Sequence, residues 1–234
     1  MNVLAFDTCF GAVSVAVRWQ SAGGEWLLRE AYEEMEIGQA ERLVPMIASV
    51  MQSARIEFSD LHRIAVTRGP GSFTGVRVGV AAARALALAA GLPVVAATSL
   101  RLMAARADVI LGARPQPVVA VAVDARRGGL YLQLFQAGTC AELSPAEVVS
   151  PQEASRRIAG YEAVAVGSGA DTLAHAAAAE ADCRVETRLT ALQPHAGDLV
   201  VLAPTLTPVA SIAPLYLRPP DAKPQVDAAL PRAD

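Results

Sequence analysis

A glycine-rich turn that joins an apolar run to a long apolar helix constrains the fold of this chain most. Residues 69–75 read Gly-Pro-Gly-Ser-Phe-Thr-Gly and follow the β-branched run 62–67. The residues after the turn predict a helix over about 74–90, which Gly91 ends, and the apolar run 93–97 predicts a buried strand. A strand, a helix and a strand at this spacing predict a right-handed parallel crossover and hence an α/β fold.

The residues before this crossover predict three antiparallel strands and a helix. The apolar run 2–6, the alternating run 12–19 and the run 25–32 are typical of strands, with a Gly-Gly hairpin turn before the third. Residues 39–54 have helical spacing, although Pro45 requires a kink or a later start. The first hundred residues are therefore predicted to form a mixed five-stranded sheet.

The rest of the chain repeats this pattern in shortened form. Residues 117–123 and 130–136 predict two strands around a turn, and residues 162–166 predict a third strand. Helices are predicted over 152–159 and 171–181.

Composition excludes several classes of protein. The chain is 53% hydrophobic and carries a net charge of −3, which excludes disorder for most of it and argues against a broad nucleic-acid-binding surface. Lys223 is the only lysine, so the body of the chain has none for a phosphate loop or a Schiff base. The start lacks a basic segment, and no run of about eighteen residues is free of Arg, Gly and Pro. We therefore expect a cytoplasmic protein without a membrane span.

The cysteines and histidines do not predict a metal centre. Cys9, Cys140 and Cys183 lie far apart in the sequence and fit ordinary thiols better than a disulfide framework or a zinc motif. The three histidines of the chain also lack the spacing of metal ligands. A zinc hydrolase or a metalloprotease is therefore poorly supported.

The glycine-rich turn and the end of the first strand are the candidate anion sites. Gly69, Gly71 and Ser72 precede a helix N-terminus, where backbone N–H groups attract anions. Asp7 and Thr8 end the first strand, which is a plausible place for a metal–phosphate site. The turn is not a Walker loop, because valine stands where that loop requires lysine. A tight structural turn is the favoured alternative for the first site, and a surface carboxylate is the alternative for the second.

The predicted helix 74–90 is apolar on two faces. One face is a small apolar stripe suited to packing close on a sheet: Gly75, Gly79, Ala82 and Leu86. The other face is not polar enough for plain solvent surface and holds Arg77, Val80, Ala81, Arg84 and Leu88. We interpret this second face as a partner surface, and the alternative is that another part of the chain covers it.

Five segments together carry a pattern that is specific to one family. They are LAFDTCFGAVSVAV near the start, then AERLVPMI, TRGPGSFTGVRVGVAAARALA and VDARRGGLY, and finally PLYLR. In this order they resemble the bacterial TsaB (YeaZ) family, the dimerization subunit of the tRNA threonylcarbamoyladenosine machinery. The run GPGSFTGVR is the specific element of the resemblance.

The resemblance implies an α/β fold of two ribonuclease-H-like lobes, as in the actin, hexokinase and Hsp70 ATPase superfamily, with a reduced second lobe. On this basis residues 1–100 form the first lobe, residues 101–218 the second, and residues 219–234 a flexible tail. The vestigial phosphate-loop positions that such a fold implies are Asp7, Thr8, Gly69, Gly71, Ser72, Gly167 and Gly169.

The resemblance also implies a subunit that is not itself an enzyme. The paralogous catalytic subunit (TsaD) carries an HxxxH metal pair, and the corresponding positions here are Ala97 and Arg101, neither of which supplies a neutral imidazole. Family members read DARxGE after Asp124, whereas this chain has Gly129, so any role of that glutamate is lost or moved. No metal and no cofactor of its own are implied, and ATP or ADP at the subunit interface is left open.

The implied function is that of a scaffold for threonylcarbamoyl transfer to N6 of adenosine 37 in tRNAs that read ANN codons. The chain would pair with TsaD, help to dock the ATPase subunit TsaE, meet tRNA through the complex and form a homodimer when alone. An ATPase or phosphotransferase that acts on its own is the alternative. The expected interface residues are Arg42, Met46, Arg77, Val80, Ala81, Arg84 and Leu88. Val80→Glu is expected to weaken pairing by several kcal/mol, because it buries an unpaired charge.

Overall fold

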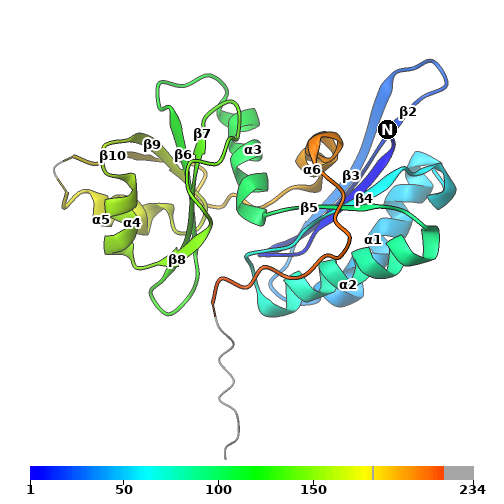
Figure 1. Ribbon diagram of the computed structural model, residues 1–234, viewed down its shortest axis with the longest axis horizontal. Helices are drawn as coiled ribbons and strands as arrows, with labels where there is room; N and C mark the ends of the chain where they lie inside the picture. The colour runs from blue at the N-terminus through cyan, green and yellow to red at the C-terminus, as the bar shows by residue number, and fades with distance from the viewer. Residues whose placement is uncertain (181, 219–234) are drawn as a thin grey trace, which may run out of the picture.

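Two five-stranded mixed sheets form the framework of the computed structural model, which describes residues 1–180 and 182–218 (Figure 1). The first sheet has the order β3-β2-β1-β4-β5, and the second has the order β8-β7-β6-β9-β10. In each sheet three antiparallel strands adjoin two strands that run parallel to the central one. The two sheets therefore share one topology, as the shortened repeat in the sequence predicts.

The strands match the predicted runs to within a few residues. Those of the first sheet are β1 (Val3–Asp7), β2 (Ala12–Gln20), β3 (Trp26–Glu34), β4 (Arg63–Thr67) and β5 (Val94–Ala97). Those of the second are β6 (Val118–Asp124), β7 (Leu130–Gln136), β8 (Glu147–Val149), β9 (Glu162–Val166) and β10 (Arg184–Thr187). The short strands β8 and β10 were not predicted.

The helices cover both faces of the sheets. They are α1 (Gln39–Ala54), α2 (Phe73–Ala90), α3 (Ser99–Leu111), α4 (Pro151–Ile158), α5 (Ala170–Ala177) and α6 (Ala196–Leu202). Short 3₁₀ turns span Phe58–Asp60 and Ala203–Thr205. Pro45 lies inside α1 without ending it and is exposed, so the backbone carbonyl that it leaves unpaired can face water.

The central strand β1 separates two apolar cores. Leu4 and Phe6 point to the face that α1 and α2 cover, whereas Val3 and Ala5 point to the face that α6 covers. All four side chains are fully buried. Because alternate residues of a strand face opposite sides of a sheet, a continuous apolar run such as 3–6 requires cover on both sides.

The segment after β10 returns to the first sheet. Helix α6 packs on β1 and β2, and residue Val209 forms an isolated bridge with Val94 at the edge of β5 (Figure 1). The structure thus differs from the expectation that residues 101–218 form one lobe, because residues 196–212 complete the core of the first sheet. The expected flexible tail, residues 219–234, lies outside the described residues.

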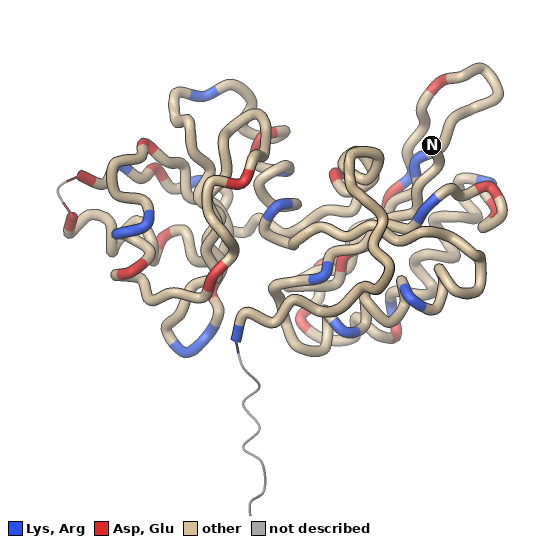
Figure 2. Tube along the Cα trace, in the orientation of Figure 1, with Lys and Arg blue, Asp and Glu red and all other residues tan. Residues whose placement is uncertain are grey.

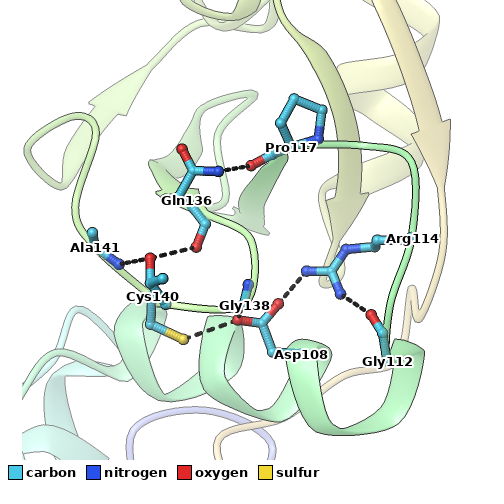
Figure 3. A network of polar contacts seen from close by, with 9 residues as sticks. Asp108, Gly112, Arg114, Pro117, Gln136, Gly138, Cys140 and Ala141 are labelled. Carbon is cyan, nitrogen blue, oxygen red and sulfur yellow. Dashed lines mark hydrogen bonds and ion pairs between the residues drawn. The ribbon is translucent and has the colours of Figure 1, made fainter.

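Helix α3 was not predicted, and it joins the two sheets. Near its end, the Asp108 carboxylate accepts a hydrogen bond from the Gly138 N–H at 2.8 Å and one from the Cys140 thiol at 3.2 Å (Figure 3). The same carboxylate pairs with the buried guanidinium of Arg114. Burial, together with the hydrogen bond to Asp108, raises the pKa of the Cys140 thiol to about 12. This network fastens α3 to the turn after β7 and keeps Cys140 a neutral thiol.

Candidate functional site

The glycine-rich turn packs directly on the end of β1. A Cβ atom on Gly75 would overlap the Thr8 carbonyl oxygen, and one on Gly71 would overlap the Cys9 carbonyl oxygen. A Cβ on Gly79, one turn along α2, would lie 2.7 Å from the Thr8 Oγ1. Glycine is therefore required here by the close approach of α2 to β1, which is the structural interpretation of the turn.

Ser72 begins α2 and ties the turn to the strand. Its N–H donates to the Cys9 carbonyl at 2.7 Å, and its Oγ accepts from the Gly75 N–H at 3.1 Å as an N-cap. The Thr8 hydroxyl donates to the Gly75 carbonyl at 2.6 Å. The Ser72 N–H and hydroxyl and both backbone groups of Gly75 are thus paired within the protein.

Asp7 is fully buried, so the structure corrects the alternative of a surface carboxylate. Its carboxylate accepts hydrogen bonds from the Thr67 hydroxyl and from the Cys9 N–H, the second at 3.2 Å. Burial raises the pKa of Asp7 from 3.8 to about 6, and these hydrogen bonds moderate the shift. The carboxylate thereby joins the ends of β1 and β4 from inside the core.

A pH titration of stability tests this placement of Asp7. Because the folded pKa of about 6 exceeds the unfolded value near 3.8, the unfolded chain binds fewer protons in this window, and stability falls as pH rises through it. Above the window the ionised carboxylate costs about 3 kcal/mol. Asp7→Asn should flatten this slope and stabilise the protein by about 1–2 kcal/mol at neutral pH. The gain is smaller than the full cost of the ionised carboxylate, because asparagine has one acceptor fewer for the hydrogen bonds at this position. Urea unfolding across the window measures both effects.

Asp198→Asn is the matched control for that titration. Burial also raises the pKa of Asp198 to about 6, so this variant should remove a separate part of the slope and leave the Asp7 part in place. Two results together would contradict the burial of the Asp7 carboxylate. They are a wild-type protein that gains stability as pH rises from 4 to 6, and an Asp7→Asn protein whose stability has the same dependence on pH.

The second glycine turn repeats this packing in the second sheet. A Cβ on Gly167 would lie 2.6 Å from the Ala122 carbonyl oxygen, and one on Gly169 would lie 2.6 Å from Leu130 Cδ2. The Gly169 N–H also donates to the Ala122 carbonyl at 3.0 Å. Both turns therefore lie against the central strand of their own sheet, and neither lines the two pockets described for the structure.

The predicted partner surface on α2 needs a correction of helical phase. Val80 is 2% exposed, and Met46 of α1 is 3% exposed, so both side chains belong to the core. The buried face of α2 consists of Gly75, Val76, Gly79, Val80 and Ala83. The expectation that Val80 and Met46 supply apolar contact to a partner is wrong. Val80→Glu would place a charge in the core of this chain, so it would report on folding and not on pairing.

The arginines of that surface already have partners within the chain. The Arg77 guanidinium lies 3.6 Å from the centre of the Phe73 ring, and its Nε donates to the Tyr216 hydroxyl at 2.7 Å. Arg84 donates to the Ile212 carbonyl, and Arg42 pairs with Glu33. The C-terminal segment thus covers one side of α2, an arrangement that sequence reasoning missed.

Away from these contacts, α1 and α2 expose several apolar side chains, which we call the apolar face of α1 and α2. Leu88 is 87% exposed and Val44 is 60% exposed, and Ala81 and Ala85 of α2 are also exposed. On α1, the polar residues Glu41, Ser49 and Gln52 are exposed as well. By length and composition alone, α2 is long and apolar enough to cross a membrane, the one such helix among the described residues. It packs on β4 and α1, and two arginines interrupt its outer face.

Charge and metal-binding groups give no second site of the predicted kinds. Basic and acidic residues are interspersed over both sheets in Figure 2. Within residues 1–180 and 182–218, no three His, Cys, Asp or Glu side chains gather as metal ligands. Ala97, at one of the positions implied for the histidine pair of a catalytic paralogue, is buried, and Arg101 is partly buried.

Comparison with known proteins gives a consistent family. The sequence model for the family "TsaD: tRNA N6-adenosine threonylcarbamoyltransferase" matches residues 33–198. The chain is 31% identical to the tRNA threonylcarbamoyladenosine biosynthesis protein TsaB of Haemophilus influenzae over 182 residues, 72% of each protein. It is 35% identical to the Escherichia coli protein of the same name over 136 residues, 58% of this chain and 55% of that one. The second match thus spans about half of its relative.

A solved structure agrees with these sequence matches. YeaZ from Pseudomonas aeruginosa superposes on the chain with a TM-score of 0.75 at 29% identity, covering 92% of this chain and 99% of that one.

Proposed function

The chain belongs to the TsaB (YeaZ) family of tRNA threonylcarbamoyladenosine biosynthesis proteins, and from this premise we propose that it is a non-catalytic pairing subunit. Its partner is the TsaD-type catalytic paralogue. Together they transfer threonylcarbamoyl to N6 of adenosine 37 in tRNAs that read ANN codons, in the cytoplasm. The chain itself contributes a surface that holds the paralogue in its active arrangement.

The observation that carries this proposal is the open apolar face of α1 and α2. Leu88 and Val44 are large apolar side chains that lie mostly in solvent, and α2 also exposes the small side chains of Ala81 and Ala85. Small side chains allow the helices of two subunits to approach closely, and Leu88 can fill a pocket on the other subunit. An interface of about 1,600 Å² in total is sufficient for a stable pair.

The same face accounts for the other expected assemblies. A two-fold contact reuses one surface on both copies, so the chain pairs with itself when the paralogue is absent. TsaE docks on the mixed pair, and tRNA meets the complex rather than this subunit alone. Arg42, Arg77 and Arg84 supply polar contacts at the rim of the apolar face, and Ala81 adds apolar contact within it.

The buried groups around Asp7 support a non-catalytic role. A carboxylate that orients a metal or a phosphate must reach its ligand, whereas Asp7 is enclosed by the protein and hydrogen-bonded to Thr67 and Cys9. We therefore assign no cofactor to this subunit, and the place for ATP or ADP is the interface with the paralogue. The two sheets are assigned to ribonuclease-H-like lobes of the actin, hexokinase and Hsp70 superfamily, the second reduced.

A reconstitution assay tests the proposal. We expect tRNA to be modified when this chain, the catalytic paralogue, TsaE and threonylcarbamoyl-adenylate are combined, and modification to be lost when this chain is omitted. The isolated chain should not hydrolyse ATP, and Asp7→Asn should leave modification intact. Modification without this chain, or ATP hydrolysis by it that Asp7→Asn abolishes, would overturn the proposal in favour of an independent ATPase.

A further inference from the structure

A small pocket with two arginines opens where β4 and β5 end. Its volume is about 220 Å³. Arg68 follows β4 directly, and Thr98 and Arg101 lie at the start of α3 after β5. Residues Ser211 and Ile212 of the C-terminal segment line the opposite wall. The lining includes no residue of the glycine turns or of α1 and α2, although Arg68 directly precedes Gly69.

The guanidinium groups of Arg68 and Arg101 have no ion-pair or hydrogen-bond partner among the described residues, whereas those of two other partly buried arginines do. Arg114 pairs with Asp108, and Arg63 donates to the Ala203 carbonyl at 2.7 Å. The Nε atoms of Arg63, Arg101 and Arg114 are all buried without a hydrogen-bond partner, but only Arg101 also lacks an ion pair or hydrogen bond at the rest of its guanidinium in residues 1–180 and 182–218. A partly buried charge without a partner is costly, so an anion in the pocket would stabilise it.

The lining favours a phosphate group over other anions. Guanidinium groups bind phosphate oxygens through paired hydrogen bonds, and the hydroxyls of Thr98 and Ser211 add further donors. Glu142 is the one acidic residue of the lining, so two positive charges and one negative charge leave an excess of one positive charge. That balance suits a single phosphate group better than a polyphosphate.

The size of the pocket limits the rest of the ligand. A water molecule occupies about 30 Å³ of liquid, so the pocket holds a phosphate group with a small organic substituent. It is smaller than the pockets of roughly 300–1,000 Å³ that take drug-sized ligands. We propose that Arg68 and Arg101 form a binding site for the phosphate group of a small phosphomonoester.

Residues 209–215 of the C-terminal segment lie over the pocket, so a bound ligand should affect their mobility. The Leu215 N–H donates to the Arg68 carbonyl at 2.7 Å, and the Val209 N–H donates to the Val94 carbonyl at 2.9 Å. These bonds hold residues 209–215 over the pocket. A bound phosphate that bridges Arg101 and Ser211 fixes this segment more tightly, so hydrogen exchange of residues 209–215 slows.

Calorimetric titration of the isolated full chain tests the site without any partner subunit. The probes are ribose 5-phosphate and inorganic phosphate, with ribose as the uncharged comparison, in a chloride buffer of constant ionic strength. We expect saturable binding of one phosphate per chain, and Arg68→Gln and Arg101→Gln should each weaken it about tenfold or more. Arg29→Gln, at an exposed arginine on β3, is the matched control and should leave binding unchanged.

Several outcomes would overturn this site. They are the absence of saturable binding to the wild-type chain, equal weakening by Arg29→Gln, and unchanged binding in a folded Arg68→Gln variant. Arg68 is exposed, so that variant keeps the test decisive even if Arg101→Gln fails to fold. A short single-stranded RNA that competes through the same two arginines would overturn the assignment to a small ligand. None of these results depends on pairing with the paralogue.

Discussion

Gly75→Ala should destabilise the protein by about 4 kcal/mol or more, a large part of a typical stability of about 5–15 kcal/mol. The added Cβ overlaps the Thr8 carbonyl oxygen and comes within 2.7 Å of the Ser72 Oγ. Neither group can move freely, because Thr8 follows the buried central strand and Ser72 caps α2. At a helix position without such an overlap, alanine stabilises a helix by about 1 kcal/mol relative to glycine. A loss of stability in Gly75→Ala therefore indicates the steric overlap, whereas a gain would indicate helix propensity alone.

Urea unfolding of Gly75→Ala beside Gly23→Ala measures this effect. Gly23 lies in the exposed hairpin turn before β3, and its added Cβ would meet only the Ser21 Oγ, at 3.8 Å. This control should change stability by less than about 1 kcal/mol. A Gly75→Ala protein as stable as the wild type would contradict the close packing of the turn on β1. It would then favour the interpretation of the turn as a phosphate loop.

Leu88→Glu should weaken pairing with the catalytic paralogue about 100-fold or more, close to 3 kcal/mol. The wild-type side chain is 87% exposed in the free chain, so the substitution leaves the fold intact. In the complex it removes the burial of a leucine and puts an unpaired carboxylate into an apolar contact, and each change opposes binding. Val44→Glu on α1 should act in the same direction.

Val109→Glu is the matched control for this surface. Val109 is 68% exposed on α3, away from α1 and α2, so the same change of charge there should leave affinity near that of the wild type. Fluorescence titration of the labelled paralogue compares the variants. Equal affinities for Leu88→Glu and the wild type, with both folded, would move the docking surface away from α2.

Patterns that depend on neighbouring residues were read correctly from the sequence. Period-two and continuous apolar runs predict β1, β2, β4, β6 and β9, because strand burial follows directly from residue type. The helices 39–54 and 74–90 were predicted to within one residue, since Gly91 ends the second. Helix α3 was missed because its apolar residues do not form one clear stripe: Leu102 belongs to the core on the first sheet, whereas Leu100 and Met103 belong to the core on the second.

Features that depend on distant residues could not be predicted. The phase of α2 was misjudged because alanine and glycine lie on every face, and because the large apolar residues Leu86 and Leu88 lie outside the buried face that Val76 and Val80 mark. That Asp7 is buried depends on Thr67, sixty positions later, as its hydrogen-bond donor. The contact of Tyr216 with Arg77 likewise spans 139 residues and has no local signal.

Light scattering during size-exclusion chromatography of this chain, the catalytic paralogue and their mixture tests the central claim most directly. The account predicts a homodimer of this chain that gives way to a mixed complex on addition of the paralogue, and loss of that complex with Leu88→Glu but not with Val109→Glu. Two proteins that elute unchanged after mixing would contradict a pairing role for the apolar face of α1 and α2.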